Sequence, residues 1–173
     1  MKPTVYQVQV RVFLKELQKF YEDNSDYGTL QKPYPANSFF EVICPKAKFW
    51  GPLKNILILD SDCTYQWSIV SKDGIPVTFS SADDSFMEFE MLSKDPSPQK
   101  WGKIFENPTM DKDKVKVKST KKDNDFFELD TTLNIEPSVR LKYSFLFEFT
   151  DDSGDVKYGS IDPDGSTTPP PEP

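Results

Sequence analysis

Acidic side chains are the first candidates for chemistry in this sequence, because its 173 residues include no histidine. The lack of histidine excludes Ser–His and Cys–His nucleophile pairs, histidine general bases, and zinc, copper or iron held by histidine. A glycosidase needs two carboxylates across a cleft, one of them with a raised pKa. The nearby aspartate pairs are Asp60 with Asp62, Asp83 with Asp84, and Asp151 with Asp152. Each pair falls at an expected strand end or turn, so we interpret them as turn residues.

The cysteines and the acidic C-terminal motif do not predict a metal site. Cys44 and Cys63 are outside any C-x-x-C pattern, and two thiols cannot complete a tetrahedral zinc site. We expect two buried, reduced thiols, with a disulfide as the alternative. Asp162-Pro163-Asp164-Gly165 resembles the opening of a calcium loop, but the remainder of that loop is missing. We expect a turn there, and we expect neither a metal nor any other cofactor.

The charge of the chain argues against nucleic-acid and membrane partners. A formal net charge of −7 repels phosphate backbones and anionic lipid surfaces. Six lysines nevertheless gather in one segment: Lys112, Lys114, Lys116, Lys118, Lys121 and Lys122. They could form a phosphate-binding stripe or a solvated strand face that discourages edge-to-edge pairing. Asp111, Asp113 and Asp123 dilute the run and favour the second interpretation.

Two tryptophans are the candidates for a ligand site or an interface. Trp50 and Trp101 stand beside Gly51 and Gly102 in expected loops, where an aromatic ring can stack on a sugar or be buried against a partner. The two rings could equally cap the ends of a sandwich. Trp67 lies within an alternating segment and is expected in the core.

The positions of these candidates depend on many short strands. Apolar residues alternate with polar ones around residues 6–13, 63–69, 87–91, 115–117, 127–135 and 139–149, which is typical of half-buried strands. Apolar runs at 39–44, 53–59, 75–79 and 156–161 add further strands, with turn signals at 72–74 and 152–154. Leu14, Leu17, Phe20 and Tyr21 instead fall at helical intervals. Residues 23–37 are expected to form an irregular loop.

This pattern predicts an all-β fold: an antiparallel β-sandwich, of jelly-roll or immunoglobulin-like type, with one short helix near the N-terminus. Aromatic residues make up 14% of the chain, which favours a packed interior. We expect one domain over residues 1–162 and a Pro-rich C-terminal tail over residues 163–173.

The order of the segments carries a family resemblance. A Val-rich strand is expected first, at residues 6–13. The motifs that follow it are Phe40-Glu41-Val42-Ile43-Cys44-Pro45, Gly51, the apolar run 53–59, Asp60-Ser61-Asp62 and Tyr65-Gln66-Trp67. The C-terminal motifs are Tyr143-Ser144-Phe145-Leu146-Phe147, the expected turn 152–154 and Asp162-Pro163. This order resembles the AidA/PixA family of bacterial inclusion body proteins. Ile161 departs from the aromatic residue usual in the family, the chain has only 4 Met where the best-known member is rich in Met, and residues 75–125 match no motif of it.

The resemblance implies a β-sandwich protein that accumulates in the cytoplasm as inclusions and has no transferable catalytic residues. Our first hypothesis is a non-enzymatic protein that self-associates as a homo-oligomer, first as a dimer. The alternative is a carbohydrate-binding module that uses Trp50 or Trp101, and a carboxylate-based hydrolase comes last. The N-terminus lacks the apolar core of a signal peptide, and no segment approaches about 20 apolar residues, so we expect a cytoplasmic protein.

Overall fold

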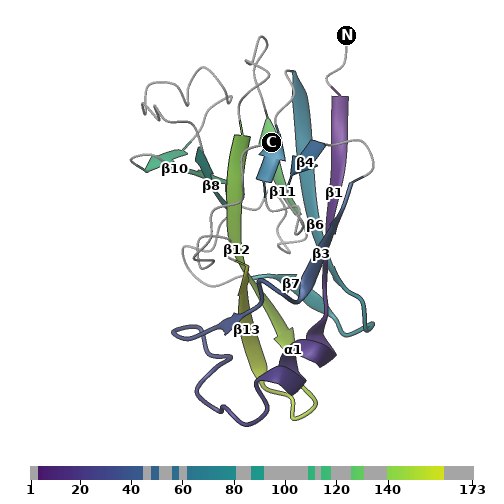
Figure 1. Ribbon diagram of the computed structural model, residues 1–173, viewed down its shortest axis with the longest axis vertical. Coiled ribbons are helices and arrows are strands. Elements are labelled where there is room, and N and C mark those ends of the chain that lie inside the picture. The colour runs from purple at the N-terminus through teal and green to yellow at the C-terminus, as the bar shows by residue number, and fades with distance from the viewer. Residues whose placement is uncertain are drawn as a thin grey trace.

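The computed structural model (Figure 1) describes residues 4–44, 48–50, 56–58, 62–80, 87–91, 109–111, 114–117, 126–130 and 140–161. In these residues the chain forms thirteen strands and one short helix, which confirms the predicted all-β class. The elements are β1 (Thr4–Val12), α1 (Leu14–Phe20), β2 (Tyr34–Pro35), β3 (Phe40–Ile43), β4 (Lys48–Trp50), β5 (Ile56–Ile58), β6 (Cys63–Ser71), β7 (Val77–Phe79), β8 (Met87–Met91), β9 (Thr109–Asp111), β10 (Lys114–Val117), β11 (Phe126–Asp130), β12 (Arg140–Thr150) and β13 (Val156–Ile161).

The smaller sheet contains four strands in the order β11-β6-β1-β3. Side chains of its two long strands alternate between the interior and the outer face, as the sequence predicts. The buried set is Val8, Val10 and Val12 from β1 and Cys63, Tyr65, Trp67 and Ile69 from β6. One face of this sheet therefore contributes to the core.

The central pair of the smaller sheet runs parallel, with Thr4 opposite Cys63 and Val12 opposite Ser71. The expectation of a wholly antiparallel sandwich is wrong for β1 and β6, and also for β2 and β13. Alternation shows which face of a strand is buried, but it contains no information on strand direction. Parallel neighbours need a long crossover, and partners in β1 and β6 are 59 positions apart in sequence.

The larger sheet contains nine strands, and β12 is its central element. β12 pairs with β5 and β8 along its first half and with β7 and β13 along its second half, always antiparallel. Its 11 residues are long enough to give each short partner its own stretch of backbone. Gly159 of β13 lies against Phe147, and a Cβ at this position would overlap the phenylalanine ring. The strand therefore needs glycine there for steric reasons.

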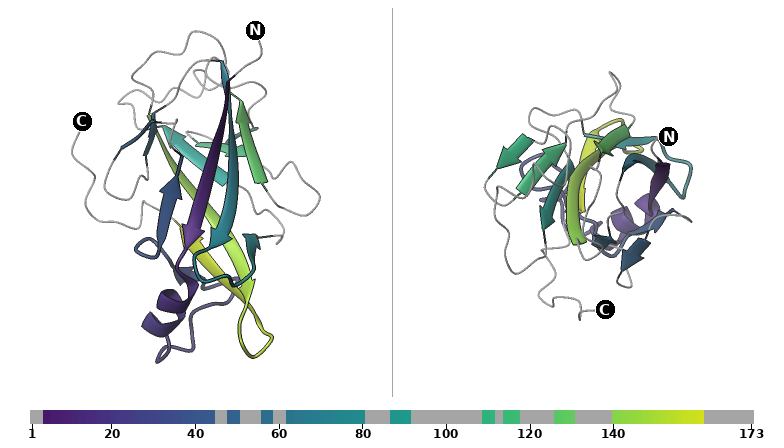
Figure 2. Two further views of the ribbon diagram at one scale, coloured as in Figure 1. Left: turned by 90° about the vertical axis from the view of Figure 1, so that its right-hand side faces the viewer. Right: turned by 90° about the horizontal axis from the view of Figure 1, so that it is seen from above.

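Aromatic side chains join the two sheets. The ring of Trp67, from β6, lies 4.8 Å from that of Tyr143 in β12 and 5.9 Å from that of Phe89 in β8, measured between centroids. Figure 2 shows β1 and β6 lying alongside β12 and β13, with this interior between them. The two sheets pack against each other, while the choice between jelly-roll and immunoglobulin-like type stays a prediction.

Two short strands lie where the sequence predicts irregular chain. β4 falls in the expected connection between residues 45 and 52, and β2 falls in the expected loop 23–37. β2 pairs with β13, which is distant in sequence, and β4 pairs with β5. Such partners are set by tertiary contacts, and the local Pro and Gly signals hide them.

The domain boundaries remain predictions. Residues 162–173, which include the Asp162–Gly165 motif and the predicted tail, lie outside the described residues. Among the described residues, no helix has the length and apolar character needed to cross a membrane.

Candidate interaction surface

The structure places Trp50 at the end of β4, where it pairs with Ile56 of β5. The expectation of a loop at Trp50 is therefore wrong, because Lys48–Trp50 form a strand that pairs antiparallel with Ile56–Ile58. Trp101 lies outside the described residues. The proposed role of Trp101 as a ligand or interface residue, and carbohydrate binding by the chain, therefore stay predictions. Trp67 is fully buried, which confirms its predicted place in the core.

The aspartate pair at 151–152 serves a turn, as predicted. Oδ1 of Asp151 accepts hydrogen bonds from the backbone N–H groups of Ser153 and Asp155, both at 2.9 Å. Its Oδ2 lies 4.0 Å from Nζ of Lys157. Gly154 completes the turn with a φ of 83°, which glycine adopts without strain. Asp60, Asp83 and Asp84 lie outside the described residues.

Both cysteines are buried, as expected, and no disulfide joins them in the structure. Cys44 follows β3 and Cys63 begins β6, so each occupies an apolar position at the end of a core strand. Among the described residues, no group of three or more potential metal ligands comes together. Lys114 and Lys116 lie in β10 as predicted, whereas the other lysines of that run lie outside the described residues.

The main surface feature was not predicted from the sequence: an exposed aromatic ring on α1. Leu14 and Leu17 are buried beneath the helix, but 69% of the Phe20 surface is exposed. The helical spacing contains the signal, because seven residues after Leu14 the buried face returns at Tyr21 and leaves Phe20 at its margin. The expected helical spacing is confirmed by α1, with Leu14 and Leu17 buried and Phe20 exposed.

Phe20 belongs to a connected group of rings, which we call the aromatic cluster. Its members are Phe20, Tyr21, Tyr27, Tyr34, Phe39 and Phe149. The Phe20 ring lies 4.9 Å from the ring of Tyr21 and 5.4 Å from that of Phe39. Tyr21 continues to Tyr27 at 4.9 Å and to Tyr34 at 5.4 Å. Because Tyr34 stacks on the buried Phe149 of β12, the cluster runs from the core to the exposed ring.

Tyr21 fixes the middle of the cluster. Its hydroxyl donates a hydrogen bond to the backbone carbonyl of Pro35 at 3.1 Å, which ties the end of α1 to β2. Burial raises the pKa of Tyr21 above its ordinary value, and the neighbouring Tyr27 adds to the rise. The Tyr21 hydroxyl therefore stays protonated, and keeps donating this bond, to a higher pH than an ordinary tyrosine would.

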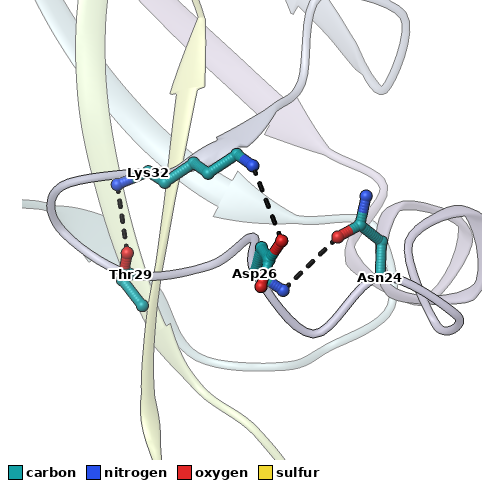
Figure 3. Close-up of polar contacts among 4 residues, drawn as sticks. All are labelled: Asn24, Asp26, Thr29 and Lys32. Atoms are coloured by element: carbon teal, nitrogen blue, oxygen red, sulfur yellow. Dashed lines mark hydrogen bonds and ion pairs between the residues drawn. The ribbon is translucent and has the colours of Figure 1, made fainter.

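The loop after α1 is held by local polar contacts (Figure 3). Oδ1 of Asn24 accepts from the N–H of Asp26, and Oγ1 of Thr29 accepts from the N–H of Lys32. Nζ of Lys32 lies 4.0 Å from Oδ2 of Asp26 and 4.3 Å from the centre of the Tyr27 ring. The carbonyl of Gly28 accepts from the N–H of Tyr158 in β13 at 2.9 Å. These bonds hold the loop beside the sheet. They also fix the position of the aromatic cluster.

The helix itself is anchored by a distant turn. Phe13 at its N-cap makes no side-chain cap, and Oδ2 of Asp73 instead accepts from the N–H of Lys15 at 2.9 Å. Nζ of Lys72, in the same turn, lies 4.8 Å from the centre of the Phe13 ring. Figure 1 shows α1, this turn region and the β12–β13 turn at one end of the molecule. Phe20 therefore lies on a helix whose N-terminal turn is held by Asp73.

Exposed charges of both signs occur in α1 and in the two residues after Tyr21. Lys15 and Lys19 are exposed on α1, and Glu16 is exposed between them. Glu22 and Asp23 are exposed just after the helix ends. The segment therefore has a net charge of −1 from two lysines and three acidic residues, an acidic excess like that of the chain as a whole.

Comparison with known proteins identifies no family for this chain. No protein-family model and no curated protein matches this chain. Among solved structures, the chain is similar to the crystal structure of the inclusion body protein PixA from Burkholderia cenocepacia J2315. That similarity has a TM-score of 0.44 and 13% sequence identity, over 92% of this chain and 93% of the other.

Proposed function

We propose that this protein is non-enzymatic and works by self-association, first as a homodimer, in the cytoplasm, where it can accumulate as inclusions. The order of sequence motifs that resembles the AidA/PixA family supports the inclusion part of the proposal. The exposed ring of Phe20, continuous with the buried aromatic cluster, supports the association part. Exposed apolar surface of this kind is stabilised by burial against a partner.

Light scattering on a size-exclusion column tests the proposal. The wild-type chain is run over a concentration series, and each concentration is repeated at low and high salt. The expected result is a molar mass near twice that of the 19.9 kDa chain, with the dimer fraction rising with concentration. A molar mass of one chain under every condition would overturn the proposal.

A further inference from the structure

We propose that Asp73, in the turn between β6 and β7, is a modification site. Its side chain isomerises slowly to isoaspartate through a cyclic imide that forms with the backbone nitrogen of Gly74. In the product the main chain runs through Cγ of residue 73, so the backbone gains a methylene group and the free carboxylate moves. The inference is independent of the proposed self-association, and it concerns the contact that holds the start of α1.

The sequence selects this position because ring closure requires an unhindered nitrogen in the following residue. Among the described aspartates, Asp73 alone is followed by glycine. Glycine has no Cβ to crowd its own nitrogen, whereas Val156, which follows Asp155, is branched at that carbon. The reacting atoms belong to adjacent residues, so the reaction is intramolecular and avoids most of the entropic cost of bringing them together.

The turn leaves Gly74 open to the reaction. Its φ is 74°, the residue is exposed, and no heavy atom beyond its chain neighbours lies within 4 Å of the position that a Cβ would take. The N–H groups of Lys72 and Asp73 donate to the carbonyl of Val12 and to Oγ of Ser71, both at 3.0 Å. The N–H of Gly74 takes no part in these two bonds, so ring closure leaves their donors and acceptors in place.

The carboxyl group of Asp73 is held by a hydrogen-bond donor. Its Oδ2 accepts from the backbone N–H of Lys15 at 2.9 Å. When the nitrogen of Gly74 attacks Cγ, negative charge develops on a carboxyl oxygen, and a donor at this distance stabilises that charge. The contact therefore favours Oδ2 as the oxygen that stays and Oδ1 as the oxygen that leaves.

The reaction balances with water as its only co-reactant. The bond between the nitrogen of Gly74 and Cγ of Asp73 forms, and the proton of that nitrogen leaves with the Oδ1 hydroxyl of the neutral carboxyl group as one water molecule. Water then adds to the ring. Cleavage at Cγ restores aspartate, and cleavage at the main-chain carbonyl carbon of residue 73 gives isoaspartate. Nothing is oxidised or reduced, and the mass of the chain is unchanged.

Isomerisation removes the anchor of α1. The side-chain carbon that carried the acceptor for Lys15 becomes the peptide link to Gly74, and the new carboxylate stands on a different carbon. Phe13 at the N-cap makes no side-chain cap, so the first turn of α1 then loses its carboxylate acceptor. The modification therefore weakens the attachment of α1 as the protein ages.

Peptide mapping of aged protein tests the proposal. The folded wild-type chain is incubated at neutral pH for several weeks and then digested with an endoprotease that cleaves before aspartate but not before isoaspartate. The expected result is a growing fraction of peptide left uncut between Lys72 and Asp73, with unchanged mass. A sample kept unfolded in urea is the positive control for the chemistry.

Two variants separate ring closure from other causes of missed cleavage. Gly74→Ala adds a methyl group beside the nucleophile, so the uncut fraction should fall several-fold. The site has room for the methyl group but its φ is positive, so circular dichroism must show that this variant is folded. Asp73→Asn closes the same ring by releasing ammonia, so its conversion to the acid reports ring closure in the folded chain as a mass gain.

Each outcome decides the proposal. Isoaspartate at residue 73 in the folded wild type, reduced in Gly74→Ala, supports it. Isoaspartate in the urea sample alone would show that the fold prevents ring closure, and the proposal would be overturned. Equal rates in the wild type and Gly74→Ala would overturn the role of the Gly74 nitrogen. Ring closure needs a single chain, so a monomeric result in light scattering leaves this test unaffected.

Discussion

At the scale of single residues, the interior depends on aromatic side chains that cross between the sheets. Trp67 and Tyr143 come from different sheets, and their ring centroids are 4.8 Å apart. Both side chains are almost wholly buried. Burial raises the pKa of the Tyr143 hydroxyl well above its ordinary value, because the phenolate would lose its hydration.

The raised pKa of Tyr143 predicts a loss of stability at alkaline pH. Above about pH 10, tyrosine in the unfolded chain releases its proton, whereas folded Tyr143 keeps it. The folded state then binds more protons than the unfolded state, so the free energy of unfolding falls as pH rises. The contribution of this one group is about 1.4 kcal/mol per pH unit. The stabilising contribution of protonated Tyr143 is fully present below the ordinary tyrosine pKa. It is lost progressively as the pH rises from that value toward the pKa of the folded state.

Tyr143→Phe should remove that part of the pH dependence. Urea unfolding of both proteins from about pH 8 to about pH 11 gives the slopes. The variant can be less stable at every pH, but its curve should fall less steeply above about pH 10. Parallel curves for the two proteins would contradict the prediction.

At the scale of elements, the turn between β6 and β7 supports α1. Asp73→Ala removes the carboxylate that accepts the N–H of Lys15, and the helix has no side chain of its own at the N-cap to replace it. We expect a loss of about 1 kcal/mol in the free energy of unfolding, the usual effect of removing a cap. Urea denaturation measures it. Asp73→Asn keeps an oxygen acceptor and should lose less, so equal losses in both variants would argue against capping.

Much of this element structure was predictable from local pattern. The alternation at 6–13, 63–69 and 139–149 predicted β1, β6 and β12 and the side chains that each buries. Turn residues predicted the bends at Gly74 and Gly154, both of which have positive φ. Side-chain periodicity and turn chemistry are properties of a few adjacent residues, so a single sequence is enough to show them.

The failures have a common physical origin, since each depends on residues far away in the chain. The parallel direction of β1 and β6 and the pairing of β2 with β13 are set by how distant segments pack. Asp73 was predicted as a turn residue, yet its contact with α1 connects positions 58 apart.

At the scale of the whole molecule, net charge controls how closely two copies can approach. The chain carries −7 at neutral pH and has a pI of about 4.7. Lowering the pH brings the net charge toward zero, so repulsion between copies weakens. We expect a higher dimer fraction at about pH 5, where the carboxylates begin to take up protons, than at about pH 7.5, measured by light scattering at constant ionic strength. A fraction that stays constant or falls would show that net charge does not limit association.

The central position of β12 has a consequence for biosynthesis. β5, β7 and β8 are translated well before Arg140 and have their shared partner in β12, and β1 must wait for β6, 59 positions later. A nascent chain leaving the ribosome therefore holds several aromatic and apolar strands without their final neighbours until β12 has been made. Long-range pairing of this kind is slow to form. Translation speed across the last stretch before β12 thus becomes a determinant of how much chain reaches the native state.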